Sequence, residues 1–200
     1  MNKKIGMYSS ICNVICVAVF AIMMLFENDF VSYLSSMFIA FSFAAMIGAF
    51  SSYTEPEKKA AANTAMIFAA IYVTIIILIY FAQLTVVHQG ELTEQANSLL
   101  DYQNFGLFFN YNLLGYGMMA LSTFFAGLSI EAETKVDKWL KRLLMIHGIF
   151  FITCLIAPLM GLFTTDMEGC KWIGIMVLEV WCIYFIPIGV LSAIHFLNKE

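Results

Sequence analysis

Glu179 is the residue of this chain whose type and surroundings most clearly indicate chemistry. It lies in a run from Trp172 to Phe196 that has no other acidic or basic side chain apart from His195. A charged side chain inside a membrane-spanning helix costs about 2.5–3.5 kcal/mol on insertion scales, so it usually faces protein or a cavity. Because such residues often bind ligands or carry protons, the sequence predicts a functional site at Glu179.

Polar side chains on three other expected helices lie at about the same depth as Glu179. Counted at about 1.5 Å per helical residue, they fall roughly 7–12 Å below the outer membrane edge, with Tyr116 one turn deeper. An aromatic pocket with a few polar groups is typical of small-molecule sites, so we predict an outward-facing ligand site here. Its expected ligand-binding residues are Glu179, Asn112, Tyr116, Gln83, Tyr80, Ser36 and Trp172.

Two other interpretations of this polar layer stay open. In the first, Asn112, Gln83 and Tyr116 hold a protonated Glu179 and tie the helices together, since burial favours the neutral acid. In the second, a membrane-embedded enzyme that modifies or isomerises lipids uses Glu179 alone. Help from His147 is not expected, because about 11 Å of depth separates the two residues and proton transfer needs about 3 Å or one bridging water.

The remaining reactive side chains predict no metal site, no cofactor and no further catalytic residues. The three histidines are scattered, and no His-x-x-x-His or Glu-x-x-His pair occurs. Cys12 and Cys16 share a helical face, but no histidine or carboxylate lies near them, so we expect them to pack in the core. We also expect no nucleic-acid partner.

Composition places these residues in an all-α, polytopic membrane protein. Hydrophobic residues make up 62% of the chain and charged residues 12%, which is far more apolar than a soluble domain. Six runs are long enough to span a bilayer, and they form one membrane domain over residues 1–200. Pro158 and Pro187 predict bends in the last two helices. The expected helices cover residues 5–26, 30–53, 62–87, 105–130, 140–163 and 172–197.

The longest connection, His88 to Asn104, carries apolar residues on one helical face. That pattern predicts a short amphipathic helix on the outer side, between the third and fourth spanning helices.

Basic residues are distributed very unevenly among the connections. The positive-inside rule therefore places both termini in the cytoplasm, as expected for a multi-pass protein of the cytoplasmic (inner) membrane. The outer connections are acidic, and they could concentrate cationic ligands. Only Lys171 falls on the outer side, and the inner basic residues are Lys3, Lys4, Lys58, Lys59, Lys135, Lys138, Lys141, Arg142 and Lys199.

Small residues recur at four-residue spacing on two helices, as Ala40, Ala44 and Gly48 and as Ala61, Ala65 and Ala69. Such stripes permit close helix packing within the bundle or docking of a membrane protein partner. With six helices and both termini inside, the layout resembles that of the substrate-binding subunits of bacterial energy-coupling-factor vitamin transporters. In that family the alanine stripe lies on the first helix, where this chain has only Ala18 and Ala21.

Together these patterns favour one functional class. We expect a transporter subunit or sensor that lies among membrane lipids and binds a small amphipathic or cationic molecule around Glu179. A lipid-modifying enzyme and a structural or partner-binding bundle remain the alternatives.

Overall fold

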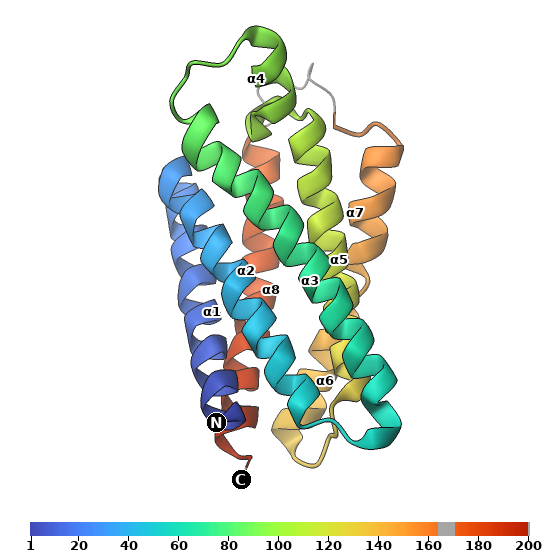
Figure 1. The fold of residues 1–200 in the computed structure, drawn as a ribbon. Helices are drawn as coiled ribbons and strands as arrows, with labels where there is room; N and C mark the ends of the chain where they lie inside the picture. Colours follow the sequence, from blue (N-terminus) through green and yellow to red (C-terminus); the bar gives the residue numbers. More distant parts are fainter. Residues whose placement is uncertain (164–170, 200) are drawn as a thin grey trace.

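The computed structural model describes residues 1–163 and 171–199, and the regular elements in these ranges are all helices (Figure 1). The all-α prediction is therefore confirmed for the described part of the chain. The α-helices are α1 (Asn2–Leu25), α2 (Asp29–Ser52), α3 (Lys59–Ala82), α4 (Glu94–Leu100), α5 (Leu107–Ser129), α6 (Lys135–His147), α7 (Phe150–Leu159) and α8 (Lys171–Leu197). Three short turns accompany them: η1 (Pro56–Lys58), η2 (Gln83–Val87) and η3 (Tyr102–Asn104).

The long helices run between two ends of an elongated bundle. Both termini, the α2–α3 connection and the start of α6 lie at one end, which we call the termini end (Figure 1). The α1–α2 connection and α4 lie at the opposite end, the α4 end. The basic connections thus share one end, as the sequence predicts, and their cytoplasmic orientation stays a prediction.

Five helical stretches are long and apolar enough to cross a membrane: Asn2–Leu25, Asp29–Ser52, Pro56–Val87, Lys135–Leu159 and Gly174–Leu197. They support an all-α, multi-pass membrane bundle. Helix α5 is long as well, but it is not among the five, because asparagine, glycine, serine and tyrosine lower its mean hydropathy. The predicted count of six spanning helices therefore stays a prediction.

The helices form two groups that pack side by side. In the first group α1 packs against both α2 and α8, and in the second α3, α6 and α7 pack around α5. The groups meet along α2 and α3, and α6 contacts α8 near the termini end (Figure 1).

The fifth expected helix is interrupted, so it forms α6 and α7. The break occurs at Gly148, where a Cβ atom would lie 2.8 Å from the Cβ of Phe124 on α5. Glycine permits this close approach, and the chain turns before α7 begins. The sequence did not predict this interruption. Pro158 lies inside α7 and Pro187 inside α8, and the bends predicted at these prolines stay predictions.

The prediction of a short helix between residues 88 and 104 is confirmed. Helix α4 has seven residues, and the side chain of Thr93 caps it by accepting a hydrogen bond from the backbone N–H of Ala96 at 3.3 Å. The rest of the connection includes η3 and leads into α5.

The small residues of α3 contribute to packing within the bundle. Ala65 and Ala69 are buried, and the Ser122 hydroxyl of α5 donates a hydrogen bond to the Ala65 carbonyl at 2.8 Å. On α2, Ala40 is buried, whereas a Cβ atom on Gly48 would meet nothing within 4 Å. These contacts favour intramolecular packing for the α3 stripe, and docking of a partner on either stripe stays a prediction.

Replacing Ala65 with leucine should therefore destabilise the protein by about 1–3 kcal/mol, because the larger side chain forces α3 away from α5. Thermal unfolding in detergent measures the effect. The matched control is Ala70→Leu, because Ala70 is exposed on the same helix. Equal melting temperatures for the two variants would contradict the packing of α3 on α5.

Candidate ligand-binding cavity and the polar layer beneath it

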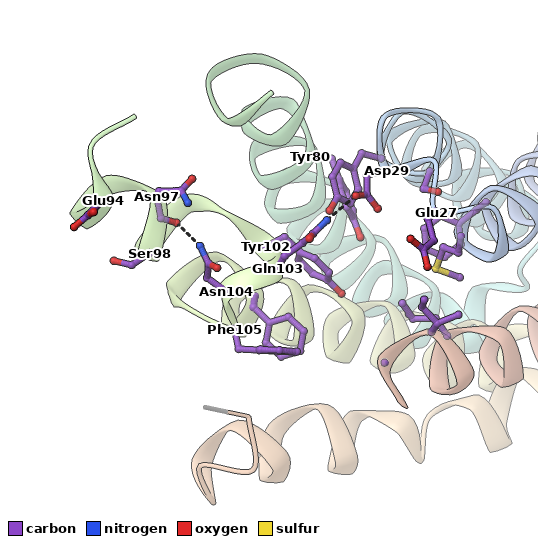
Figure 2. A pocket seen from close by; sticks show the side chains of 18 residues that line it. Glu27, Asp29, Tyr80, Glu94, Asn97, Ser98, Tyr102, Gln103, Asn104 and Phe105 are labelled. Carbon is purple, nitrogen blue, oxygen red and sulfur yellow. Dashed lines mark hydrogen bonds between the residues drawn. The ribbon is translucent and has the colours of Figure 1, made fainter. Parts of the chain in front are cut away.

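A cavity of about 500 Å³ lies at the α4 end between the two helix groups. Its walls come from α1, α2 and α8 on one side and from α3, α5 and the segment 94–105 on the other (Figure 2). Cavities of this size are typical of sites for small molecules. Of the seven residues that the sequence predicts to bind ligand, only Tyr80 is among the described lining residues, and the ligand site stays a prediction.

Aromatic side chains form much of the cavity wall. The ring of Tyr33 lies 5.4 Å from that of Tyr80, and Tyr102 lies 6.1 and 6.3 Å from these two. Phe105 and Phe109 continue the wall, with ring centroids 4.8 Å apart. Burial raises the pKa of the Tyr102 hydroxyl well above its ordinary value, so this residue offers a neutral phenol. Such a wall suits apolar groups and cations that contact ring faces.

Three carboxylates line the same cavity: Glu27, Asp29 and Glu94. Figure 2 shows Glu94 toward one side and Glu27 toward the other, with Tyr102 and Phe105 between them in this view. The side chain of Gln103 donates a hydrogen bond to Asp29 at 2.6 Å. Among the described lining residues there is no lysine, arginine or histidine. A cavity lined by one sign of charge attracts ligands of the opposite sign, here cations.

Gln83, which the sequence predicts to bind ligand, holds the wall of the cavity in place. Its side-chain Nε2 donates to the Leu100 carbonyl at 2.6 Å, and its Oε1 accepts from the Tyr102 backbone N–H at 3.2 Å. Gln83 also begins η2, the π-turn that ends the third long helix. The residue thus links this helix end to the segment 94–105, and its amide is engaged by backbone groups.

Four predicted residues meet beneath the cavity. The Tyr80 side chain lines the cavity and lies beside Ser36 of α2 and Asn112 and Tyr116 of α5. Ser36 Oγ, Asn112 Oδ1 and the Tyr116 hydroxyl are buried and have no hydrogen-bond partner among the described residues. Buried polar atoms usually have partners, and these three groups surround the Tyr80 side chain, so the layer is placed to form hydrogen bonds within itself or with a further group.

Glu179 lies next to this layer on α8. Successive turns place it on the helical face of Ile175, Leu178 and Cys182, and the first two of these line the cavity. Its side chain is half-buried, and Oε1 is buried without a hydrogen-bond partner among the described residues. Cys182 lies near both Glu179 and Tyr80. Glu179 is thus beside the cavity rather than in its lining.

Trp172, the last predicted residue, lies near the start of α8, where 64% of its surface is exposed. It is not among the lining residues. Of the predicted residues, the structure therefore places Tyr80 in the cavity wall, three others in the layer below, Glu179 beside that layer, and Gln83 in a scaffolding position.

His147 is unsuitable as a catalytic base. Its Nε2 accepts a hydrogen bond from the Trp181 indole at 3.0 Å, so Nδ1 carries the proton and donates to Thr123 Oγ1 at 2.8 Å. Both ring nitrogens are therefore engaged. Within residues 1–163 and 171–199, no group of three or more histidine, cysteine, aspartate or glutamate side chains is arranged to hold a metal ion.

Sequence reasoning missed most of the cavity wall, including Glu27, Asp29, Tyr33, Tyr102 and Phe109. The excess of acidic residues in the connections at the α4 end was the available signal, because Glu27, Asp29 and Glu94 all line this cavity. The aromatic residues carried no comparable signal, since tyrosine and phenylalanine are frequent throughout the chain.

A scan of protein-family models and searches of curated proteins and solved structures find no match to this chain. The resemblance to vitamin-transporter subunits therefore rests on the predicted helix layout alone. The function is therefore inferred from the size and the lining residues of the cavity.

Proposed function

We propose that this protein binds a small cationic amphipathic molecule in the cavity at the α4 end, as a transporter subunit or a sensor. The main observation is a cavity of about 500 Å³ whose described lining combines aromatic rings and three carboxylates with no basic side chain. The carboxylates favour a cationic group, and the rings favour its apolar part. Glu179 and the unpartnered polar layer would form the deep end of the same site.

The orientation of the protein is part of this proposal. The inner, basic connections lie at the termini end (Figure 1), so the positive-inside rule directs that end to the cytoplasm and the cavity outward. A ligand would then approach from outside a cytoplasmic membrane.

Equilibrium binding tests the proposal. The purified protein in neutral detergent is titrated with a fluorescent single-chain amphiphile that carries a trimethylammonium group, and with a probe of the same chain that carries a sulfate. We expect at least tenfold tighter binding of the cation, which corresponds to about 1.4 kcal/mol. Because the attraction is electrostatic, rising salt should reduce the difference.

Equal affinities for the two probes, or tighter binding of the sulfate, would contradict the proposal. Partition of both probes into detergent micelles is measured in the absence of protein and subtracted.

The variant Glu179→Gln separates charge from size at the deep end of the site. A carboxylate attracts a cation and its protonated form does not, so in the wild-type protein Glu179 should strengthen binding of the cationic probe as pH rises. Glutamine should remove that contribution, which we expect to be roughly fivefold at neutral pH, or about 1 kcal/mol. The measurement is the difference between the two pH profiles of affinity. Identical profiles would exclude Glu179 from the site.

A further inference from the structure

A second group of buried polar side chains lies near the termini end, where α6 meets α8. His195 Nδ1 and Asp137 Oδ1 are 2.5 Å apart, and 4% of the His195 and 5% of the Asp137 surface is exposed. The other carboxylate oxygen of Asp137 accepts from the Thr134 backbone N–H at 2.9 Å and from its hydroxyl at 2.7 Å. Asp137 therefore acts as an acceptor toward its neighbours, and His195 donates from Nδ1.

The second ring nitrogen of His195 has a different environment. Nε2 makes no hydrogen bond to a described residue, and His195 lines a small cavity of about 30 Å³ together with Thr54, Ser129, Glu131 and Lys199. This volume is sufficient for about one water molecule. A water molecule in this cavity would lie beside His195, while Nδ1 stays bonded to Asp137.

We propose that the Asp137–His195 pair is a proton-binding site, and that proton uptake strengthens the contact between α6 and α8. A proton taken from water at Nε2 turns the neutral imidazole into an imidazolium. The pair then changes from a net charge of −1 to an ion pair with no net charge. Hydrogen bonds between two ionised groups are stronger than those with a neutral partner, so loss of the proton weakens the contact.

Charged groups lie near the pair on several sides. Lys199, which follows α8, and Glu133 of the α5–α6 connection influence the charge of His195 in opposite directions, and Glu131 lines the same small cavity. The Lys58 ammonium lies 2.7 Å from Glu131 and lowers the pKa of that carboxyl, so Glu131 stays ionised where histidine titrates. The ring of Phe50 on α2 packs near the ring of His195. Phe50 and Tyr53, which follows α2, both line the small cavity.

Because the Asp137–His195 pair lies between the two helix groups, proton uptake affects how these groups pack. The contact between α6 and α8 joins the two helix groups near the termini end, whereas the large cavity lies between them at the α4 end. Weakening this contact would let water enter between the groups from the termini end. The inference stands on the Asp137–His195 geometry and does not depend on what the large cavity binds.

The titration is observed directly by nitrogen NMR of protein labelled with ¹⁵N-histidine. We expect His195 Nε2 to change between its protonated and unprotonated signals within about pH 5–9, while Nδ1 keeps its proton. His147 is the control inside the chain, because Trp181 and Thr123 occupy both its nitrogens, so its signals should not move. A His195 that shows one state over this range would overturn the proposal.

The mechanical consequence is tested with Ser129→Cys, which puts a thiol in the wall of the small cavity. Its rate of reaction with a water-soluble maleimide is compared with that in Ser129→Cys/His195→Asn, since asparagine keeps a donor toward Asp137 but takes up no proton. The parent protein supplies the background from native cysteines. The ratio of the two rates cancels the pH dependence of the thiol itself.

We expect this ratio to be about one at high pH and to fall at least fivefold as pH is lowered through the His195 titration. A ratio that does not change with pH would overturn the proposed coupling. Should the asparagine variant fail to fold, the Asp137→Asn variant replaces it, with the same expectation that its labelling does not follow His195.

Discussion

Replacing Gly106 with alanine should weaken binding of the cationic probe at least tenfold. An added Cβ atom would lie 2.1 Å from the carbonyl oxygen of Ser98, which is far inside any normal contact. The clash is with backbone, so no side-chain rotation relieves it. The segment 94–105, which forms one wall of the cavity and carries Glu94, must therefore move.

The matched control is Gly174→Ala. Gly174 lines the same cavity, but a Cβ atom there would meet nothing within 4 Å. Alanine is also favoured over glycine in a helix by about 1 kcal/mol, so this variant should melt no lower than the wild type. Binding to Gly106→Ala that equals binding to Gly174→Ala would show that the segment 94–105 does not form the site.

Removing two of the cavity carboxylates should have a similarly large effect. In the double variant Glu27→Gln/Glu94→Gln both side chains keep their size but lose their charge. We expect about tenfold weaker binding of the cationic probe, little change for the sulfate probe, and a reduced dependence on salt. Titrations at two salt concentrations measure all three quantities.

Glu91→Gln provides the charge control. Glu91 is exposed in the same connection, and it is not among the residues that line the cavity. Its loss changes the net charge of the protein by one without changing the cavity, so we expect less than a twofold effect. A change as large as that of the double variant would mean that general surface charge, not the cavity, attracts the probe.

The approximate helix layout was accessible from the sequence because long apolar runs alternate with charged connections, although the start of α6 lies five residues before the predicted start at residue 140. The same counting brought Ser36, Tyr80 and Asn112 to one depth and Tyr116 one turn deeper, and the structure places these four side chains together. Depth along a straight helix is a one-dimensional quantity, so it can be obtained from residue numbers.

Contacts between residues that are far apart in the sequence could not be predicted by counting residues along a helix. The amide of Gln83 is engaged by the backbone of residues 100 and 102, which belong to a connection whose path the sequence does not specify. The interruption at Gly148 follows from close packing against Phe124, a contact between separate helices. The pairing of Asp137 with His195 joins two helices across 58 positions of sequence.

Glu179 illustrates both situations. Its charge within an apolar run predicted a site on this helix, and α8 does contribute residues to the cavity. Which residues of α8 face the cavity depends on how the helix packs in the bundle, which the sequence does not specify. The structure places Leu178 and Ile175, its neighbours on the same face, in the lining instead.

The central claim is that a cationic amphiphile occupies the cavity at the α4 end, and photo-crosslinking tests it most directly. The trimethylammonium probe is prepared with a diazirine near its charged group, crosslinked to the purified protein at low occupancy, and located by mass spectrometry of peptides. We expect saturable labelling of the segment 94–105 and of the α1–α2 connection around Glu27 and Asp29, reduced in Gly106→Ala. Labelling confined to the exposed faces of the helices, with none in these two segments, would contradict the account.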